Sequence, residues 1–199
     1  RTLPLASACV LTGGALAGAT GDVGFARFIP LFTGCLATVF LLQVLANFAN
    51  DLGDFENGAD RAEGNERADR AVASGRITAT QMKRAVIITA GLAFVTGVAT
   101  VLRAVGDDWP ALLKWVGAGL ASIAAAHAYT AGKRPYGYSG LGDISVLVFF
   151  GLAGVAGTAA LITGDFDPLW LLPATTIGLL SVGVLLSLIH ISEPTRHES

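Results

Sequence analysis

Residues 41–64, LLQVLANFANDLGDFENGADRAEG, join the end of an apolar run to a cluster of carboxamides and carboxylates. The run from 28 to 50 contains no Asp, Glu, Lys or Arg, and it is long enough for a helix that crosses a bilayer core of about 30 Å. Charged groups are costly next to hydrocarbon, so acids at the end of such a helix indicate a function at that membrane surface. The polar cluster consists of Asn47, Asn50, Asp51, Asp54, Glu56 and Asp60.

Five further runs share this lack of charge: 2–21, 85–102, 115–132, 144–164 and 168–192. Only 14% of the residues are charged, whereas soluble domains carry about 25%. The sequence therefore predicts an all-α, polytopic membrane helical bundle with six transmembrane helices. Gly151, Gly154 and Gly157 recur at a helical interval, as expected where small residues let membrane helices pack closely.

Basic residues are unevenly divided between the two sets of connecting loops. Because Lys and Arg accumulate on the cytoplasmic side, the loops 51–84 and 131–143 are predicted to be cytoplasmic and the protein to lie in the plasma membrane, which is the inner membrane of a cell with two. Trp109, Trp115 and Trp170 lie near span ends on the opposite side, where an interfacial aromatic belt is expected. The cytoplasmic set is Arg1, Arg61, Arg67, Arg70, Arg76, Lys83, Arg84, Lys133 and Arg134, against Arg27, Arg103 and Lys114 outside.

The acidic cluster has the spacing of one helix face. Positions 47, 50, 51 and 54 are three or four residues apart, and Gly58 could turn Asp60 back toward them. Converging carboxylates repel one another unless a cation lies between them, and a ligand set made only of oxygen favours Mg²⁺. A solvated acidic loop is the alternative. An EF-hand fails because its third and fifth positions would be Gly53 and Phe55.

Basic groups in both cytoplasmic loops could hold an anion. Arg70 and Arg76 precede Thr78-x-x-Gln81, a capping-box pattern that starts the next helix. In the second loop, Lys133 and Arg134 can bind phosphate oxygens. A nucleotide P-loop is excluded there, because His127 stands where its first glycine is needed and Arg134 where Ser or Thr is needed. Asp143 opens the fifth span, and an ionisable residue at a membrane edge is a candidate functional residue.

Four stretches resemble the UbiA superfamily of intramembrane aromatic prenyltransferases, and within it the members that act in menaquinone synthesis. They are RTLPLA (1–6), NFANDLGDFENGAD (47–60), RAVASGRIT (70–78) and YTAGKRPYGYSGLGDISVLVFFG (129–151). The resemblance extends to about residue 186. It implies nine transmembrane helices around a central cavity that opens laterally to lipid, of which six are present here.

The resemblance also implies a reaction. A polyprenyl group would pass from an allylic polyprenyl diphosphate to 1,4-dihydroxy-2-naphthoate with decarboxylation, giving demethylmenaquinone. The partners implied are these two substrates and the lipid bilayer, with no nucleic acid. The implied alternatives are another ring, such as 4-hydroxybenzoate, or a membrane transporter. The loop GKRPYGYSGLGD argues against the former, and the position of the carboxylates at span ends argues against the latter.

The resemblance assigns roles to particular residues. Mg²⁺ is expected on Asn50, Asp51, Asp54 and Asp60, and the diphosphate on Asn50, Arg70, Lys133 and Arg134. The catalytic residues are expected to be Asp51, Asp54 and Lys133. Candidate contacts to the aromatic substrate are Tyr129, Tyr136 and Asp143.

The C-terminal part departs from the family pattern. The family has a second aspartate motif after the sixth span, but no Asp follows Asp167 here. The last residues, SLIHISEPTRHES, match nothing in that pattern. We therefore expect residues 1–186 to be part of a prenyltransferase domain, residues 187–199 to be a non-native tail, and the fragment to be inactive alone.

Overall fold

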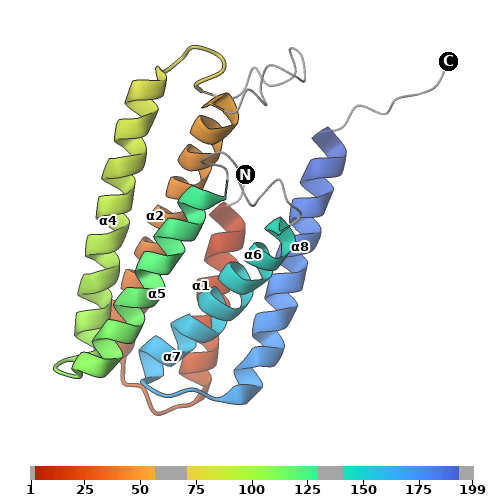
Figure 1. Ribbon diagram of the computed structural model, residues 1–199. Helices are drawn as coiled ribbons and strands as arrows, with labels where there is room; N and C mark the ends of the chain where they lie inside the picture. Colours follow the sequence, from red (N-terminus) through yellow and green to blue (C-terminus); the bar gives the residue numbers. More distant parts are fainter. Residues whose placement is uncertain (1–2, 57–70, 130–140, 193–199) are drawn as a thin grey trace.

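The computed structural model describes residues 3–56, 71–129 and 141–192, with side chains described as far as residue 187. All regular elements within these ranges are helical (Figure 1). Their bounds are α1 Leu3–Ala19, α2 Phe25–Glu56, α4 Ala79–Val105, α5 Trp109–Ala128, α6 Gly142–Val146, η3 Leu147–Gly157, α7 Thr158–Thr163, η4 Pro168–Trp170 and α8 Leu171–Ser192.

Five of these segments are long and apolar enough to cross a membrane: Phe25–Glu56, Ala79–Val105, Trp109–Ala128, Gly142–Thr163 and Pro168–Ser187. The first helix, α1, is also apolar but has only 17 residues in the described part of the chain. The predicted all-α, polytopic membrane bundle is confirmed, and each charge-free run lies largely within one helical segment. The chain is a multi-pass membrane protein.

The helices extend beyond the charge-free runs because polar residues form their ends. α2 continues through the acidic cluster to Glu56, as the spacing of that cluster predicted. At the start of α4, Thr78 Oγ1 accepts from Gln81 N–H at 3.2 Å, and Gln81 Oε1 accepts from Thr78 N–H at 2.8 Å. This confirms the predicted capping box. Asp108 caps α5 in a similar way, accepting from Ala111 N–H at 3.0 Å.

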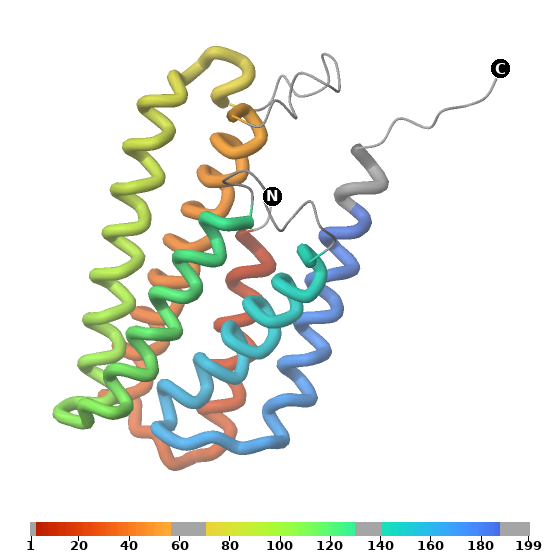
Figure 2. The backbone as a smooth tube through the Cα atoms, in the orientation of Figure 1, coloured from red at the N-terminus to blue at the C-terminus, as the bar shows by residue number. Residues whose placement is uncertain are grey.

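The bundle is built around α1, which packs against α2, η3, α7 and α8 (Figures 1 and 2). α2 lies beside α4 and α5, and η3 lies beside α8. One core cluster contains Val10, Cys35, Val101 and Leu161, so it joins α1, α2, α4 and α7. Many large apolar side chains are exposed, as expected for a surface that faces lipid.

Arg27 ties together three helices at the end of the bundle opposite the acidic cluster. Its Nε donates to Ile162 O at 2.9 Å, and its Nη2 donates to Ala104 O at 3.1 Å. These carbonyls belong to the last turns of α7 and α4, whose C-terminal oxygens lack partners within their own helices. A cation is also favourable at a helix C-terminus.

The recurring glycines pack helices together, as predicted, but each faces a different neighbour. A Cβ on Gly151 would lie 2.5 Å from Ala174 O and 3.1 Å from Gly178 Cα, both in α8. A Cβ on Gly154 would lie 2.8 Å from Cys9 Cβ in α1. At Gly157 the nearest atom would be Cζ3 of Trp115 in α5, at an ordinary 3.8 Å.

We predict that Gly151→Ala lowers the free energy of unfolding by about 2 kcal/mol or more, because the added methyl meets backbone atoms that cannot rotate away. Gly91→Ala is the matched control, since nothing lies within 4 Å of a Cβ there and alanine favours helix. The measurement is thermal unfolding of the purified protein in detergent. Equal melting temperatures for the two variants would contradict the close packing of η3 on α8.

Two features differ from the sequence predictions. Of the three tryptophans predicted to form an aromatic belt, Trp109 is 67% exposed, whereas Trp170 is 7% exposed within the core and Trp115 is half-buried, so these two pack against other helices. Residues 147–157 form a π-helix inside the fifth span, and Phe149 and Phe150 from it line a cavity. π-helical turns occur frequently at functional sites.

Candidate functional site: an apolar cavity with a polar end

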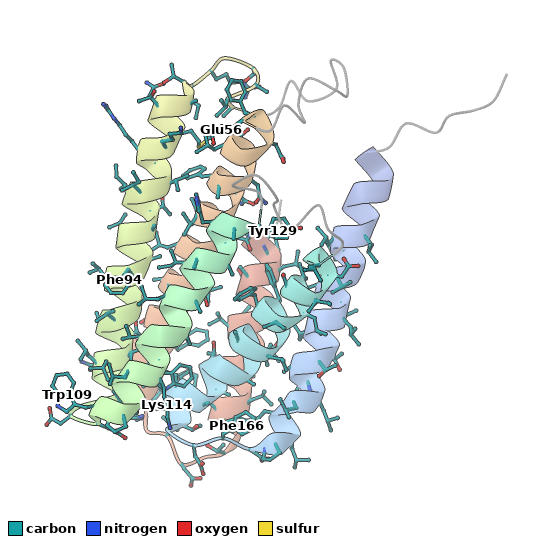
Figure 3. All side chains as sticks on the ribbon, viewed as in Figure 1. Glu56, Phe94, Trp109, Lys114, Tyr129 and Phe166 are labelled. Carbon is teal, nitrogen blue, oxygen red and sulfur yellow. The ribbon has the colours of Figure 1, made fainter. Side chains whose placement is uncertain are left out.

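A cavity of about 380 Å³ lies within the bundle, lined by side chains from α1, α2, α4, α5, α6, η3, α7 and α8. Most of its lining is apolar. The carboxamides of the lining gather toward the end of α2 that carries the acidic cluster, where Figure 3 also places Tyr129, at the end of α5. They belong to Gln43, Asn47 and Asn50. The hydroxyl side chains of the lining are spread along the cavity: Thr38, Thr100, Ser122, Ser145, Thr158 and Ser181. Such a cavity fits a molecule with a polar head and a hydrocarbon body.

The predicted acidic residues lie at this polar end. Asn50 lines the cavity. Asp51 Oδ2 accepts from Ala71 N–H at 3.1 Å, while Asp51 Oδ1 is buried and has no hydrogen-bond partner among the described residues. Asp54 is only 6% exposed. Asn50 and Asp51 are adjacent in α2 and Asp54 lies about one turn further on, so α2 itself holds the three side chains close together.

The unpartnered oxygen of Asp51 fits a bound cation. A buried carboxylate oxygen without a partner is costly, and a hard cation would satisfy it. No group of three or more His, Cys, Asp or Glu side chains that could hold a metal occurs within residues 3–56, 71–129 and 141–187. Of the four predicted metal ligands, this part of the chain contains three: the carboxylates of Asp51 and Asp54 and the carboxamide of Asn50. The predicted fourth ligand, Asp60, lies outside the described residues.

A small apolar core holds the acidic end of α2 in place. Leu52, Val72 and Met82 pack together, with Phe48 and Phe55 against them. This cluster draws the 71–77 segment onto α2 and so brings Ala71 N–H to Asp51. The segment closes through a turn at Gly75, whose φ is +72°, a conformation that favours glycine.

An ion pair at the surface connects α2 and α4. Lys83 Nζ lies 2.7 Å from Glu56 Oε1, with side chains 57% and 45% exposed. An exposed pair of this kind contributes at most about 1 kcal/mol. The carboxylate of Glu56 therefore belongs to the surface, unlike those of Asp51 and Asp54.

The predicted basic and aromatic residues are only partly described. Tyr129 lines the cavity, and its hydroxyl would lie 2.9 Å from a Cβ built on Gly142, so it packs against the start of α6. Asp143 is half-buried in the first turn of α6 but does not line the cavity. The remaining predicted residues lie outside the described residues and stay predictions: Arg70, Lys133, Arg134 and Tyr136.

Sequence reasoning missed several polar residues of the cavity, among them Gln43 and Ser145. Gln43 Nε2 donates to Asn47 Oδ1 at 3.4 Å, one helical turn away. The spacing 43, 47, 50 is a helical one and could have revealed Gln43. Ser145 had no comparable signal, because its contribution depends on how α6 packs.

Comparisons of the sequence with known proteins identify its family. The chain matches the UbiA prenyltransferase family over residues 6–193. It is 43% identical over 185 residues to a 1,4-dihydroxy-2-naphthoate octaprenyltransferase of Haemophilus influenzae, covering 93% of this chain and 59% of the relative. It is 45% identical over 188 residues to the enzyme of that name in Escherichia coli, covering 93% of this chain and 58% of the relative.

A more distant relative carries the same name. The 1,4-dihydroxy-2-naphthoate octaprenyltransferase of Mycobacterium tuberculosis is 33% identical over 190 residues, covering 94% of this chain and 60% of the relative. The chain thus spans about three fifths of the length of these relatives. No solved structure matches it. From the match over nearly its whole length, the chain belongs to the UbiA prenyltransferase family.

Proposed function

We propose that the full-length protein transfers a polyprenyl group from an allylic polyprenyl diphosphate to 1,4-dihydroxy-2-naphthoate. The observation that carries this proposal is the cavity whose polar end, at Asn50 and Tyr129, continues into an apolar interior. A donor with a charged head and a hydrocarbon chain needs both the polar end and the apolar interior. The names of the relatives support the naphthoate as acceptor.

The proposed reaction breaks the allylic C–O bond of the donor, and the diphosphate leaves with the electron pair. The ring carbon that carries the carboxylate attacks the allylic carbon, a C–C bond forms, and the carboxylate leaves as CO₂ to restore the aromatic ring. The apolar walls keep water from the electron-poor allylic carbon until the ring attacks. The protein mainly positions the two substrates and excludes water.

We propose that Asn50, Asp51 and Asp54, with Asp60, hold a divalent cation and specifically Mg²⁺. When bound, this ion supplies Lewis-acid stabilisation of the negative charge on the leaving diphosphate. Asp51 is positioned for this by its bond to Ala71 N–H, which leaves its other oxygen available. Arg70, Lys133 and Arg134 are proposed to bind diphosphate oxygens, and Tyr136, Tyr129 and Asp143 to contact the ring.

The test uses a completed chain, in which residues 1–186 are followed by the remaining C-terminal part of the Haemophilus influenzae relative. Membranes containing it receive octaprenyl diphosphate, Mg²⁺ and either 1,4-dihydroxy-2-naphthoate or 4-hydroxybenzoate. We expect the quinol form of demethylmenaquinone from the naphthoate, detected by mass spectrometry as the quinone after oxidation by air, and no product from 4-hydroxybenzoate. Transfer to 4-hydroxybenzoate alone would reassign the acceptor, and no transfer to either ring would refute the proposal.

We propose further that residues 1–186 form part of the prenyltransferase domain and that residues 187–199 are not native to it. The composition change at SLIHISEPTRHES motivates the second statement. Peptide mass spectrometry of the protein from its natural source tests it. A natural peptide that contains this stretch would contradict the proposed boundary.

The acidic end is proposed to face the cytoplasm, because nine of the basic residues lie outside the charge-free runs at that end, against three at the other end. We predict that Ser74→Cys, in an exposed segment beside the cluster, resists an impermeant thiol reagent added outside intact cells. Asp107→Cys, exposed between α4 and α5, should react. Both variants carry Cys9→Ala and Cys35→Ala. The reverse labelling pattern would show the opposite orientation.

A further inference from the structure

A second cavity, of about 470 Å³, lies at the end of the bundle opposite the acidic cluster. It is lined by Asp108 and Ala111 at the start of α5 and by Gly164 and Phe166 after α7. Figure 3 shows Phe166 at the end of the bundle opposite Glu56. Trp115 of α5 and Leu161 of α7 line both this outer cavity and the main one.

These two side chains form a packed partition between the cavities. Leu161 is 7% exposed and belongs to the cluster with Val10, Cys35 and Val101, against which Trp115 also packs. Gly157 lies against the indole ring, since a Cβ there would make an ordinary van der Waals contact with Trp115 Cζ3 at 3.8 Å. Such packing distinguishes Trp115 from Trp109 on the same helix, which is 67% exposed.

The partition lies at the apolar end of the main cavity. Asn50 and Cys35 both line the main cavity from α2 and, at a rise of about 1.5 Å per residue, lie roughly 22 Å apart along that helix. Cys35 belongs to the same cluster as Leu161. A donor whose charged head lies at Asn50 would therefore direct its hydrocarbon chain toward Trp115.

We propose that Trp115, together with Leu161, closes the outer end of the main cavity and limits how far an isoprenoid chain can extend toward the outer face. The inference rests on the proposed function, because it takes the donor to be a prenyl diphosphate with its head at the acidic end. Trp115 would then determine which isoprenoid chain lengths fit the cavity, through the shape of its side chain. Removing the indole ring joins the main cavity to the outer one, whose lining also includes the carboxylates of Asp108 and Asp165, and so gives the chain a longer channel.

The experiment maps the end of the chain without requiring turnover. A geranylgeranyl diphosphate with a diazirine at its terminal isoprene unit is added with Mg²⁺ to membranes containing the completed chain and is photolysed. Labelled peptides are identified by mass spectrometry, and labelling counts only if unlabelled geranylgeranyl diphosphate competes with it. The shorter farnesyl probe, labelled in the same way, reports whether the position of the label follows chain length.

In the wild-type protein we expect label on main-cavity residues as far as Trp115 and Leu161, and none on 104–111 or 164–166. In Trp115→Ala, we expect the geranylgeranyl probe to label these outer segments as well. Trp109→Ala is the matched control and should label as the wild type does. If Trp115→Ala does not accumulate, Trp115→Leu keeps an apolar contact and should still open the partition.

Three results would overturn the inference. Label on the outer segments in the wild type would show that the partition is not closed, and an unchanged pattern in the Trp115 variants would show that the ring is not the barrier. Both of these leave the proposed function intact. Absence of competable label in either cavity would refute donor binding itself, and with it both proposals.

Discussion

Replacing Asp54 by alanine in the completed chain is expected to abolish Mg²⁺-dependent prenyl transfer while leaving the bundle inserted in the membrane. Asp54 is buried at the end of α2, beside Asp51, whose Oδ1 has no partner among the described residues. Losing a metal contact that stabilises a leaving group costs several kcal/mol, which corresponds to a loss in rate of roughly a hundredfold to a thousandfold. The measurement is the initial rate of demethylmenaquinone formation at saturating Mg²⁺.

Two further variants separate charge from structure. Asp51→Asn keeps an oxygen that can accept from Ala71 N–H but removes the negative charge, so activity should fall without loss of protein. Glu56→Gln removes an exposed carboxylate on the same helix, paired only with Lys83 among the contacts described, and should leave the rate within about twofold because such pairs contribute little. Near wild-type activity in Asp54→Ala, or a loss in Glu56→Gln equal to it, would contradict the assignment.

The second large expected effect is on the prenyl-transfer activity of the 199-residue chain. We predict no detectable transfer by residues 1–199 in membranes and full transfer by the completed chain. A diphosphate carries two or more negative charges, and of the predicted metal ligands the described part of the chain holds Asn50, Asp51 and Asp54, which all belong to one cluster on α2. Paired metal sites work because they stabilise both the departing and the bridging oxygens. With one acidic cluster, ionisation of the donor should be too slow to measure.

Protein levels must be matched before this comparison is interpreted. Equal amounts of both chains in the membrane fraction, measured by immunoblot, show that a loss of activity is not a loss of protein. Binding of the diazirine probe offers a second control, because weak donor binding can survive without turnover. Robust transfer by residues 1–199 would show that one acidic cluster suffices.

Composition and spacing alone were enough to predict the helices and the place of the acidic cluster. A run without charged residues that is long enough to cross a bilayer has almost no other stable conformation in lipid, since every backbone group must be hydrogen-bonded within the segment. The capping box at Thr78 marked the start of α4, and the acidic cluster indicated that α2 continues past its apolar run. The three-and-four spacing at Asn50, Asp51 and Asp54 likewise required only that α2 continue past its apolar run.

Contacts between helices could not be predicted in this way. Trp115 and Trp109 had the same sequence-based interpretation, yet one separates two cavities and the other is exposed. The sequence also did not predict that Ala71 N–H donates to Asp51. Nor did it predict that the three recurring glycines face different neighbours. The π-helix at 147–157 has no signature in its apolar sequence that we recognise.

The physical reason is that hydrophobicity sets how deep a residue lies in the membrane but not which way its helix is rotated. In lipid, apolar side chains are equally well solvated on every face of a helix, so burial does not choose the inward face. Rotation is set by close contacts such as that of Gly151 with Gly178, and by bonds such as that of Arg27 to Ile162 O. The sequence by itself therefore determined the bundle and the end at which its polar site lies, while the tertiary structure decided which side chains enclose the cavity.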